Sequence, residues 1–139
     1  MKKFIRYFIP FELIFIMLFS GCSPAKIDPD LSINEKIQNY TTEHSELLLD
    51  EVTLSWDNVL IDSAYSVETA LEKLEISNRS VVHSIPYEDE KIVLVFIRDD
   101  LIVSYTIVNF KNGTASDYIQ NYLYQNTGEM YPKGTVFKK

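Results

Sequence analysis

The sequence predicts an α+β fold, in which a small antiparallel sheet with a central hairpin at residues 91–110 is covered by helices on one side. Two apolar runs, residues 91–98 and 101–110, flank Asp99 and Asp100, and this spacing is typical of a hairpin with a two-residue turn. Segments with the apolar spacing of helices stand before and after the hairpin. The resulting order of helix, strand, helix, two strands and helix is typical of an α+β domain.

The first helix is expected to begin near Ser32, because Ser32 and Glu35 form a capping-box pattern. Apolar or aromatic residues then recur at spacings of four and three, which places them on one helical face. These residues are Ile33, Ile37, Tyr40, His44 and Leu47. Because Thr41 and Thr42 are weaker helix formers, we expect the helix to end near Tyr40.

A strand and a second helix are expected next. Residues 56–62 are short and rich in β-favouring side chains, and this strand is expected to join the hairpin. Ser66 is expected to cap the second helix, whose apolar face is Val67, Ala70, Leu71 and Leu74. Val81, Val82 and Ile85 are candidates for a further short strand.

The two-residue turn sets the expected register of the hairpin. It pairs Phe96 with Val103, Leu94 with Tyr105 and Ile92 with Ile107. That face is entirely apolar. The opposite face, which includes Val95, mixes apolar and polar side chains, so we expect one face on the core and the other partly covered or solvated.

The C-terminal part is expected to hold a last helix over residues 116–125. Its apolar stripe is Tyr118, Ile119, Tyr122 and Leu123. Gly128 is expected to stop it, and the tail at residues 131–137 is expected to add an edge strand.

The N-terminal segment has the layout of a cleavable export signal. Lys2, Lys3 and Arg6 precede a short apolar run, which ends in Ser20 and Gly21 before the chain's single cysteine, Cys22. Small residues that end at a cysteine resemble the lipobox of bacterial lipoproteins. Two alternatives are an uncleaved membrane anchor and a buried structural cysteine. Residues 7–19 are shorter than the roughly 20 apolar residues of a span, and a structural cysteine leaves the basic head unexplained.

The resemblance implies that Cys22 is lipidated and that the chain is cut before it. It implies a signal peptide at residues 1–21, a tether at residues 22–31 with Pro24 and Pro29, and one α+β domain at residues 32–139. The protein would then lie in the cell envelope, held to the membrane by lipid, with an extracytoplasmic domain. Residues 54–113 are also loosely similar to small uncharacterised bacterial lipoproteins, a similarity that implies no activity.

Charge excludes some partners. Removal of residues 1–21 takes three basic side chains and one acidic side chain from a chain of net charge −7, so the mature protein carries −9. Such a surface is repelled by phosphate backbones and anionic headgroups, so nucleic-acid binding is not expected. Attachment to the membrane would come from acyl chains, at about 0.8 kcal/mol per buried CH₂.

The sequence indicates no catalytic residue, metal site or cofactor. His44 and His83 have no His or Cys at ligand spacing, so each is expected to be a surface or half-buried side chain. The acidic run at residues 88–90 lacks the alternating spacing and glycine of a calcium loop and is interpreted as a solvated turn. Asp57 and Asp62 flank a strand, which is a weak pattern for an acid–base pair.

Aromatic residues are the candidates for binding. Tyr118 and Tyr122 fall on the helical stripe, so core packing is favoured for them. Tyr124 and Tyr131 lie off it and are expected to be exposed partner-binding residues, because interfaces favour Tyr and Trp. For Trp56 both interpretations stay open.

These observations favour a non-enzymatic, lipid-anchored envelope protein whose domain binds another envelope component, namely a protein. The alternative is a small-ligand or cation-binding accessory lipoprotein of a transporter, and a hydrolase comes third. A concave, dry pocket with polar groups would favour the second class, and two charged residues in a cleft would favour the third.

Overall fold

The computed structural model describes residues 26–53, 55–82, 85, 90–109, 114–125 and 129–139. The helices are α2 (Leu31–Glu43), α3 (Val67–Lys73) and α4 (Thr114–Gln125), with 3₁₀ turns η1 (Leu49–Glu51) and η2 (Arg79–Val82). The strands are β1 (Glu46–Leu48), β2 (Asn58–Ser63), β3 (Lys91–Arg98), β4 (Leu101–Asn109), β5 (Met130–Pro132) and β6 (Val136–Lys138). This is an α+β fold, as the sequence predicts.

The main sheet has four antiparallel strands in the order β4-β3-β2-β5. The expectation that the strand near residues 56–62 joins the hairpin is confirmed, because β2 pairs with β3. The tail supplies the expected edge strand, β5, which pairs with β2. A second sheet of two strands, β1 and β6, was not expected. It pairs Leu47 with Phe137 and so joins the first third of the chain to its last residues.

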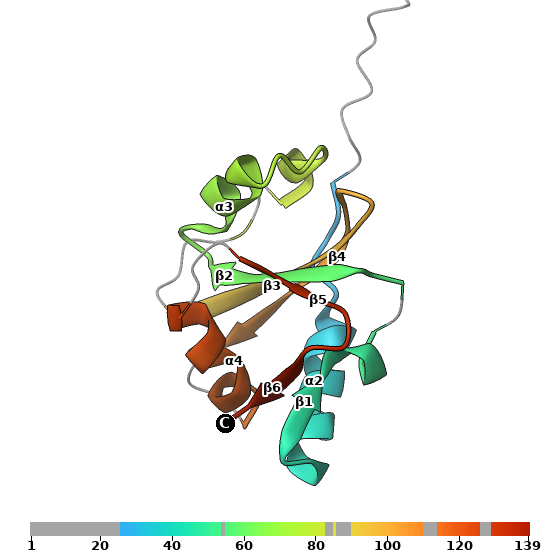
Figure 1. The fold of residues 1–139 in the computed structure, drawn as a ribbon, viewed down its shortest axis with the longest axis vertical. Helices are drawn as coiled ribbons and strands as arrows, with labels where there is room; N and C mark the ends of the chain where they lie inside the picture. The colour runs from blue at the N-terminus through green and yellow to red at the C-terminus, as the bar shows by residue number, and fades with distance from the viewer. Residues whose placement is uncertain (1–25, 54, 83–84, 86–89, 110–113, 126–128) are drawn as a thin grey trace, which may run out of the picture.

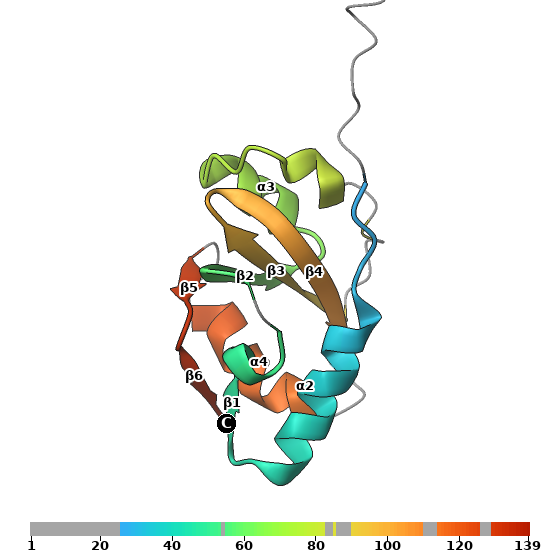
Figure 2. The ribbon, with the colours of Figure 1, turned by 90° about the vertical axis from the view of Figure 1, so that its right-hand side faces the viewer.

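The sheet is covered on both faces, so the expectation of helices on one side is wrong. In Figures 1 and 2, α3 lies on one side of the sheet, while α2, α4, β1 and β6 lie on the other. The physical reason is β3, in which residues 92–97 are all buried. A strand whose side chains are apolar on both faces needs a cover on each.

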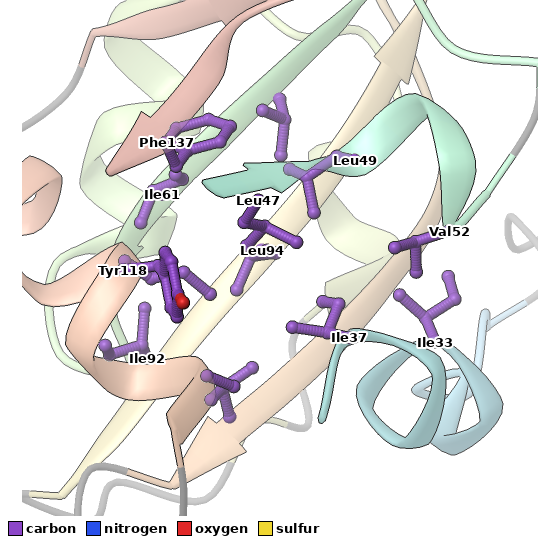
Figure 3. Packing of buried hydrophobic residues seen from close by; sticks show 14 of the residues in the cluster. Ile33, Ile37, Leu47, Leu49, Val52, Ile61, Ile92, Leu94, Tyr118 and Phe137 are labelled. Atoms are coloured by element: carbon purple, nitrogen blue, oxygen red, sulfur yellow. The ribbon is translucent and has the colours of Figure 1, made fainter. Parts of the chain in front are cut away.

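Two clusters of buried side chains fill the two layers. The first core lies between the sheet and α2, α4, β1 and β6, and includes Ile37, Leu47, Leu94, Tyr118 and Phe137 (Figure 3). The second core lies between the sheet and α3 and η2. It includes Leu60, Leu71, Val95, Ile102 and Tyr105.

The hairpin has the expected turn but not the expected register. Asp99 and Asp100 both have positive φ, 51° and 58°, as a type I′ turn requires, and Arg98 pairs with Leu101. A bulge between Phe96 and Ile97 then shifts the pairing by one residue. Because a one-residue shift moves side chains to the opposite face, the predicted pairs beyond the bulge are wrong.

The bulge decides which side chains of β4 reach each core. Phe96 pairs with Ser104, and Val95 pairs with Tyr105. Tyr105 therefore lies in the second core and not beside Leu94. Val108, expected on the mixed face, belongs to the first core.

Helix α2 differs from the prediction at both ends. Its N-cap is Asp30, whose Oδ1 accepts hydrogen bonds from the backbone N–H of Ser32 at 3.0 Å and from its hydroxyl at 2.6 Å, so the capping box at Ser32 is wrong. The helix continues beyond Tyr40 to Glu43. Within it, the hydroxyl of Thr41 donates to the carbonyl oxygen of Ile37 at 2.9 Å, a bond that threonine can make inside a helix.

The segment between β2 and β3 also departs from expectation. Ser66 stands at the N-cap position of α3 without a capping hydrogen bond, because its hydroxyl donates to Oδ1 of Asp62. Val82 belongs to the 3₁₀ turn η2 and not to a strand. Val82 and Ile85 are both buried in the second core, so these apolar residues cover the sheet without joining it.

We predict that both faces of β3 contribute to stability. Phe96→Ala is expected to lower the free energy of unfolding by about 3–5 kcal/mol. Val95→Ala is expected to lower it by about 2 kcal/mol, because its side chain is also fully buried. Urea melts of a soluble fragment that begins after Cys22 measure both. The matched control is Val136→Ala, which changes an exposed valine; a Val95→Ala cost no larger than this control would contradict the two-sided cover.

A second prediction concerns Thr106, whose buried Oγ1 has no hydrogen-bond partner among the residues that the structure describes. Because Val has the same shape without the hydroxyl, Thr106→Val is expected to leave stability unchanged or to raise it by up to about 3 kcal/mol. Thr41→Val is the control, since it removes a bonded hydroxyl and should cost about 1 kcal/mol. Equal losses in the two urea melts would be inconsistent with an unpartnered hydroxyl at Thr106.

Candidate functional site

Several predicted site residues lie outside the described residues. These are Cys22, His83, the acidic residues Glu88 and Asp89, and the side chain of Tyr124. Lipidation of Cys22 and partner binding by Tyr124 therefore stay predictions. Among the residues that the structure describes, no helix is both long enough and apolar enough to cross a membrane.

Tyr131 lies in an aromatic cluster against the first core. It is half-buried, and its ring centroid lies 5.6 Å from those of Tyr122 and Phe137 in edge-on contacts. Its hydroxyl donates to the carbonyl oxygen of Tyr122 at 3.0 Å. The expectation that Tyr131 is an exposed side chain, separate from the core, is therefore wrong, because strand β5 carries it onto the end of α4. Whether it contacts a partner stays a prediction.

Trp56 and Tyr118 are core residues. Trp56 is 2% exposed, and its Nε1–H donates to the carbonyl oxygen of Thr53 at 3.0 Å. Its ring meets Phe96 edge-on. Tyr118, also 2% exposed, donates its hydroxyl to the carbonyl oxygen of His44 at 2.8 Å. Both aromatic residues therefore satisfy their polar atoms within the domain, as buried Trp and Tyr usually do.

His44 ends helix α2 at the surface. Its backbone N–H donates to the carbonyl oxygen of Tyr40 at 3.1 Å. Its ring stacks on the Tyr40 ring at 4.0 Å between centroids, with Nδ1 3.0 Å from the same carbonyl oxygen. The side chain is exposed, as expected of a surface histidine, and these contacts give it a role in capping the helix.

The two candidates for an acid–base pair, Asp57 and Asp62, differ in their exposure to solvent. Asp57 is exposed, whereas Asp62 is 1% exposed. Oδ1 of Asp62 accepts hydrogen bonds from the backbone N–H of Ser63 at 2.7 Å and from the hydroxyl of Ser66. These bonds fix the turn from β2 into α3. Within the described residues, no group of three His, Cys, Asp or Glu side chains could hold a metal ion.

An open groove of about 420 Å³ lies between α2 and the segment that follows β1. It is lined by Lys36, Asp50, Glu51, Val52 and Thr53. Oδ1 of Asp50 also accepts a hydrogen bond from the backbone N–H of Gly134 at 3.2 Å, where a φ of +87° favours glycine. The groove therefore presents an ammonium group and two carboxylates to solvent.

Comparison with models of protein families, with curated proteins and with solved structures finds no match to this chain.

The feature that sequence reasoning missed is the packing of residues 26–30 onto the domain. The backbone N–H of Asp30 donates to the carbonyl oxygen of Tyr105 at 2.8 Å. Ile27 is half-buried and packs against the second core. The signal in the sequence is Ile27 itself. It is an apolar residue in the polar segment whose prolines predict a tether. We call residues 26–30 the strap.

A third prediction separates the two roles of Tyr131. Tyr131→Phe removes the hydroxyl that donates to Tyr122 and keeps the ring, and it is expected to cost about 1 kcal/mol of stability. Tyr131→Ala also removes contacts with Tyr122 and Phe137 and should cost about 2–4 kcal/mol, somewhat less than truncation of a fully buried aromatic residue. Thermal or urea melts compare the two variants; an unchanged melt for Tyr131→Ala would contradict a packing role.

Proposed function

We propose that the protein is a lipid-anchored protein of the cell envelope, with the anchor on Cys22, and that its domain binds another envelope protein without catalysing a reaction. The observation that carries the anchor is the order of basic residues, apolar run, small residues and single cysteine. The strap supports it, because Ile27, five residues after Cys22, already packs against the second core. A domain that starts so soon is suited to a position directly at a membrane.

The groove at Lys36 differs from a typical small-molecule site, and this difference favours a macromolecular partner over a small ligand at that place. Small-molecule sites are concave and mostly apolar, whereas the groove at Lys36 is open and carries charged side chains. The alternative, a small-ligand or cation-binding accessory of a transporter, has this groove as its candidate site. The two carboxylates of Asp50 and Glu51 are the groups that a cation would contact there.

The anchor is tested by metabolic labelling with radioactive palmitate. Wild-type protein is expected to take up label. Cys22→Ala is expected to take up none and to accumulate as a larger, uncut precursor, because the thiol is the proposed acceptor. Ser23→Ala is the matched control, since it changes the neighbouring residue and leaves the thiol in place. Equal label in the wild-type protein and Cys22→Ala would overturn the anchor.

The partner is tested by affinity capture of the native protein from detergent-extracted membranes, beside a variant with Asp50→Asn and Glu51→Gln. One protein recovered in a fixed ratio to both forms would support the proposal. Thermal stabilisation of the purified protein by Ca²⁺ or by a small solute, lost in the double variant and accompanied by no such protein, would favour the alternative.

A further inference from the structure

We infer that the docked strap fixes the orientation of the domain at the membrane, with the layer of α3 and η2 next to the lipid surface and the β1–β6 end pointing away from it. This inference rests on the proposed function in one respect only, namely that the chain before residue 26 is held at a membrane. It holds equally for a lipid on Cys22 and for an apolar segment that stays uncut.

The strap is held at both ends. At its C-terminal end, Asp30 bonds through its backbone N–H to Tyr105 of β4 and through its carboxylate to Ser32 of α2. Nearer its N-terminal end, Ile27 packs against the second core. Burial, and then the carboxylate of Asp28, raise the pKa of the Tyr105 hydroxyl, as expected where the strap covers this residue. Residues 26–30 are therefore part of the folded domain and not a free linker.

The strap gives the preceding chain a direction. In Figures 1 and 2 it runs from the start of α2, past the edge of the sheet at β4, to the level of α3 and η2. The C-terminus lies at the opposite end in both views. The contacts of the two ends support this direction. Ile27 packs against the second core, whereas Phe137 of β6 lies in the first core, on the other side of the sheet. The N-terminal end of the strap therefore lies on the α3 side of the domain.

The length of chain between Cys22 and the strap then limits how the domain can be oriented at the membrane. Cys22 and Lys26 are four residues apart, so the chain between them spans at most about 14 Å. Helix α2 has 13 residues and at 1.5 Å each extends about 20 Å. It continues the line of the strap toward the β1–β6 end (Figure 2). With the strap docked, the domain cannot place the β1–β6 end on the lipid and turn the α3 layer away.

This orientation leaves the β1–β6 end for a partner protein. Its surface is charged and has both signs: Glu46 and Lys138 form an ion pair of 2.8 Å, and Lys139 lies 3.4 Å from Asp117. Such a surface has no single sign of charge with which to attract anionic headgroups. This end therefore faces the aqueous part of the envelope, the side from which the proposed partner protein would approach.

The experiment uses the full-length protein, extracted from membranes and reconstituted into vesicles of phosphatidylethanolamine and phosphatidylglycerol. Glu72→Cys on α3 and Glu43→Cys at the end of α2 each add one thiol at an exposed position, and a fluorophore is attached to each. Quenching by a lipid with a nitroxide headgroup is then measured. The Glu72→Cys label is expected to be quenched several-fold more strongly than the Glu43→Cys label.

An undocked strap should remove this difference. Ile27→Asp places a charge against the second core, so the strap is expected to detach and the two labels to be quenched to similar extents. Lys26→Asp is the matched control, because it adds the same side chain at an exposed neighbouring position, and it should preserve the difference. If Ile27→Asp fails to fold, as shown by circular dichroism, the wild-type comparison decides alone.

Three outcomes separate this inference from the proposed function. If the two labels are quenched equally in vesicle-bound protein whose strap has the wild-type sequence, the orientation is overturned and the lipid anchor is not affected. Unequal quenching that persists in a membrane-bound Cys22→Ala precursor supports the orientation, whereas equal palmitate label in this variant and in the wild-type protein overturns the lipid anchor. Protein that does not float with the vesicles overturns both.

Discussion

The burial of β3 on both faces is the constraint on which the rest of the structure depends. Its side chains from Ile92 to Ile97 leave almost no surface to water, so neither face of the central sheet can be left open. Each face must be covered by chain that is not part of the sheet, because a face of Val, Ile, Leu and Phe in water costs roughly 25 cal/mol per Å². The positions of α3, α2 and α4 all follow from this requirement.

The two covers are built from different parts of the chain. The segment between β2 and β3 supplies the α3 side and stays local in sequence. The other side combines α2 and β1 from the N-terminal third with α4 and β6 from the C-terminal end. Phe137 and Leu47 pair across this second sheet, so the last residues of the chain complete a core that the first helix begins. Tyr122 and Tyr131 gather around Phe137 for the same reason.

The outer edge of β4 is closed by side chains and by the strap. The side-chain amide of Asn78 donates to the carbonyl oxygen of Ile102 at 3.0 Å and accepts from its backbone N–H at 2.7 Å. Farther along the same edge, Asp30 bonds to Tyr105. Such contacts occupy backbone groups that would otherwise pair with another strand. The strap therefore has two roles in one short segment: it protects an edge of the sheet and it caps the start of α2.

The sequence by itself determined the features that depend on local pattern: the α+β class, the hairpin with its Asp99–Asp100 turn, α3 and α4, and the buried stripe with Tyr118. Tertiary structure decided what local pattern does not encode. The bulge between Phe96 and Ile97 shifts the pairing with β4 by one residue, and a run of apolar residues gives no signal of such a shift. Three-residue strands such as β1 and β6 carry too few residues to show a period. The cluster of Tyr122, Tyr131 and Phe137 joins a helix to two short strands, so no single helical or strand period shows it. The strap finds its partner, Tyr105, far away in the chain, and only the folded chain brings the two together.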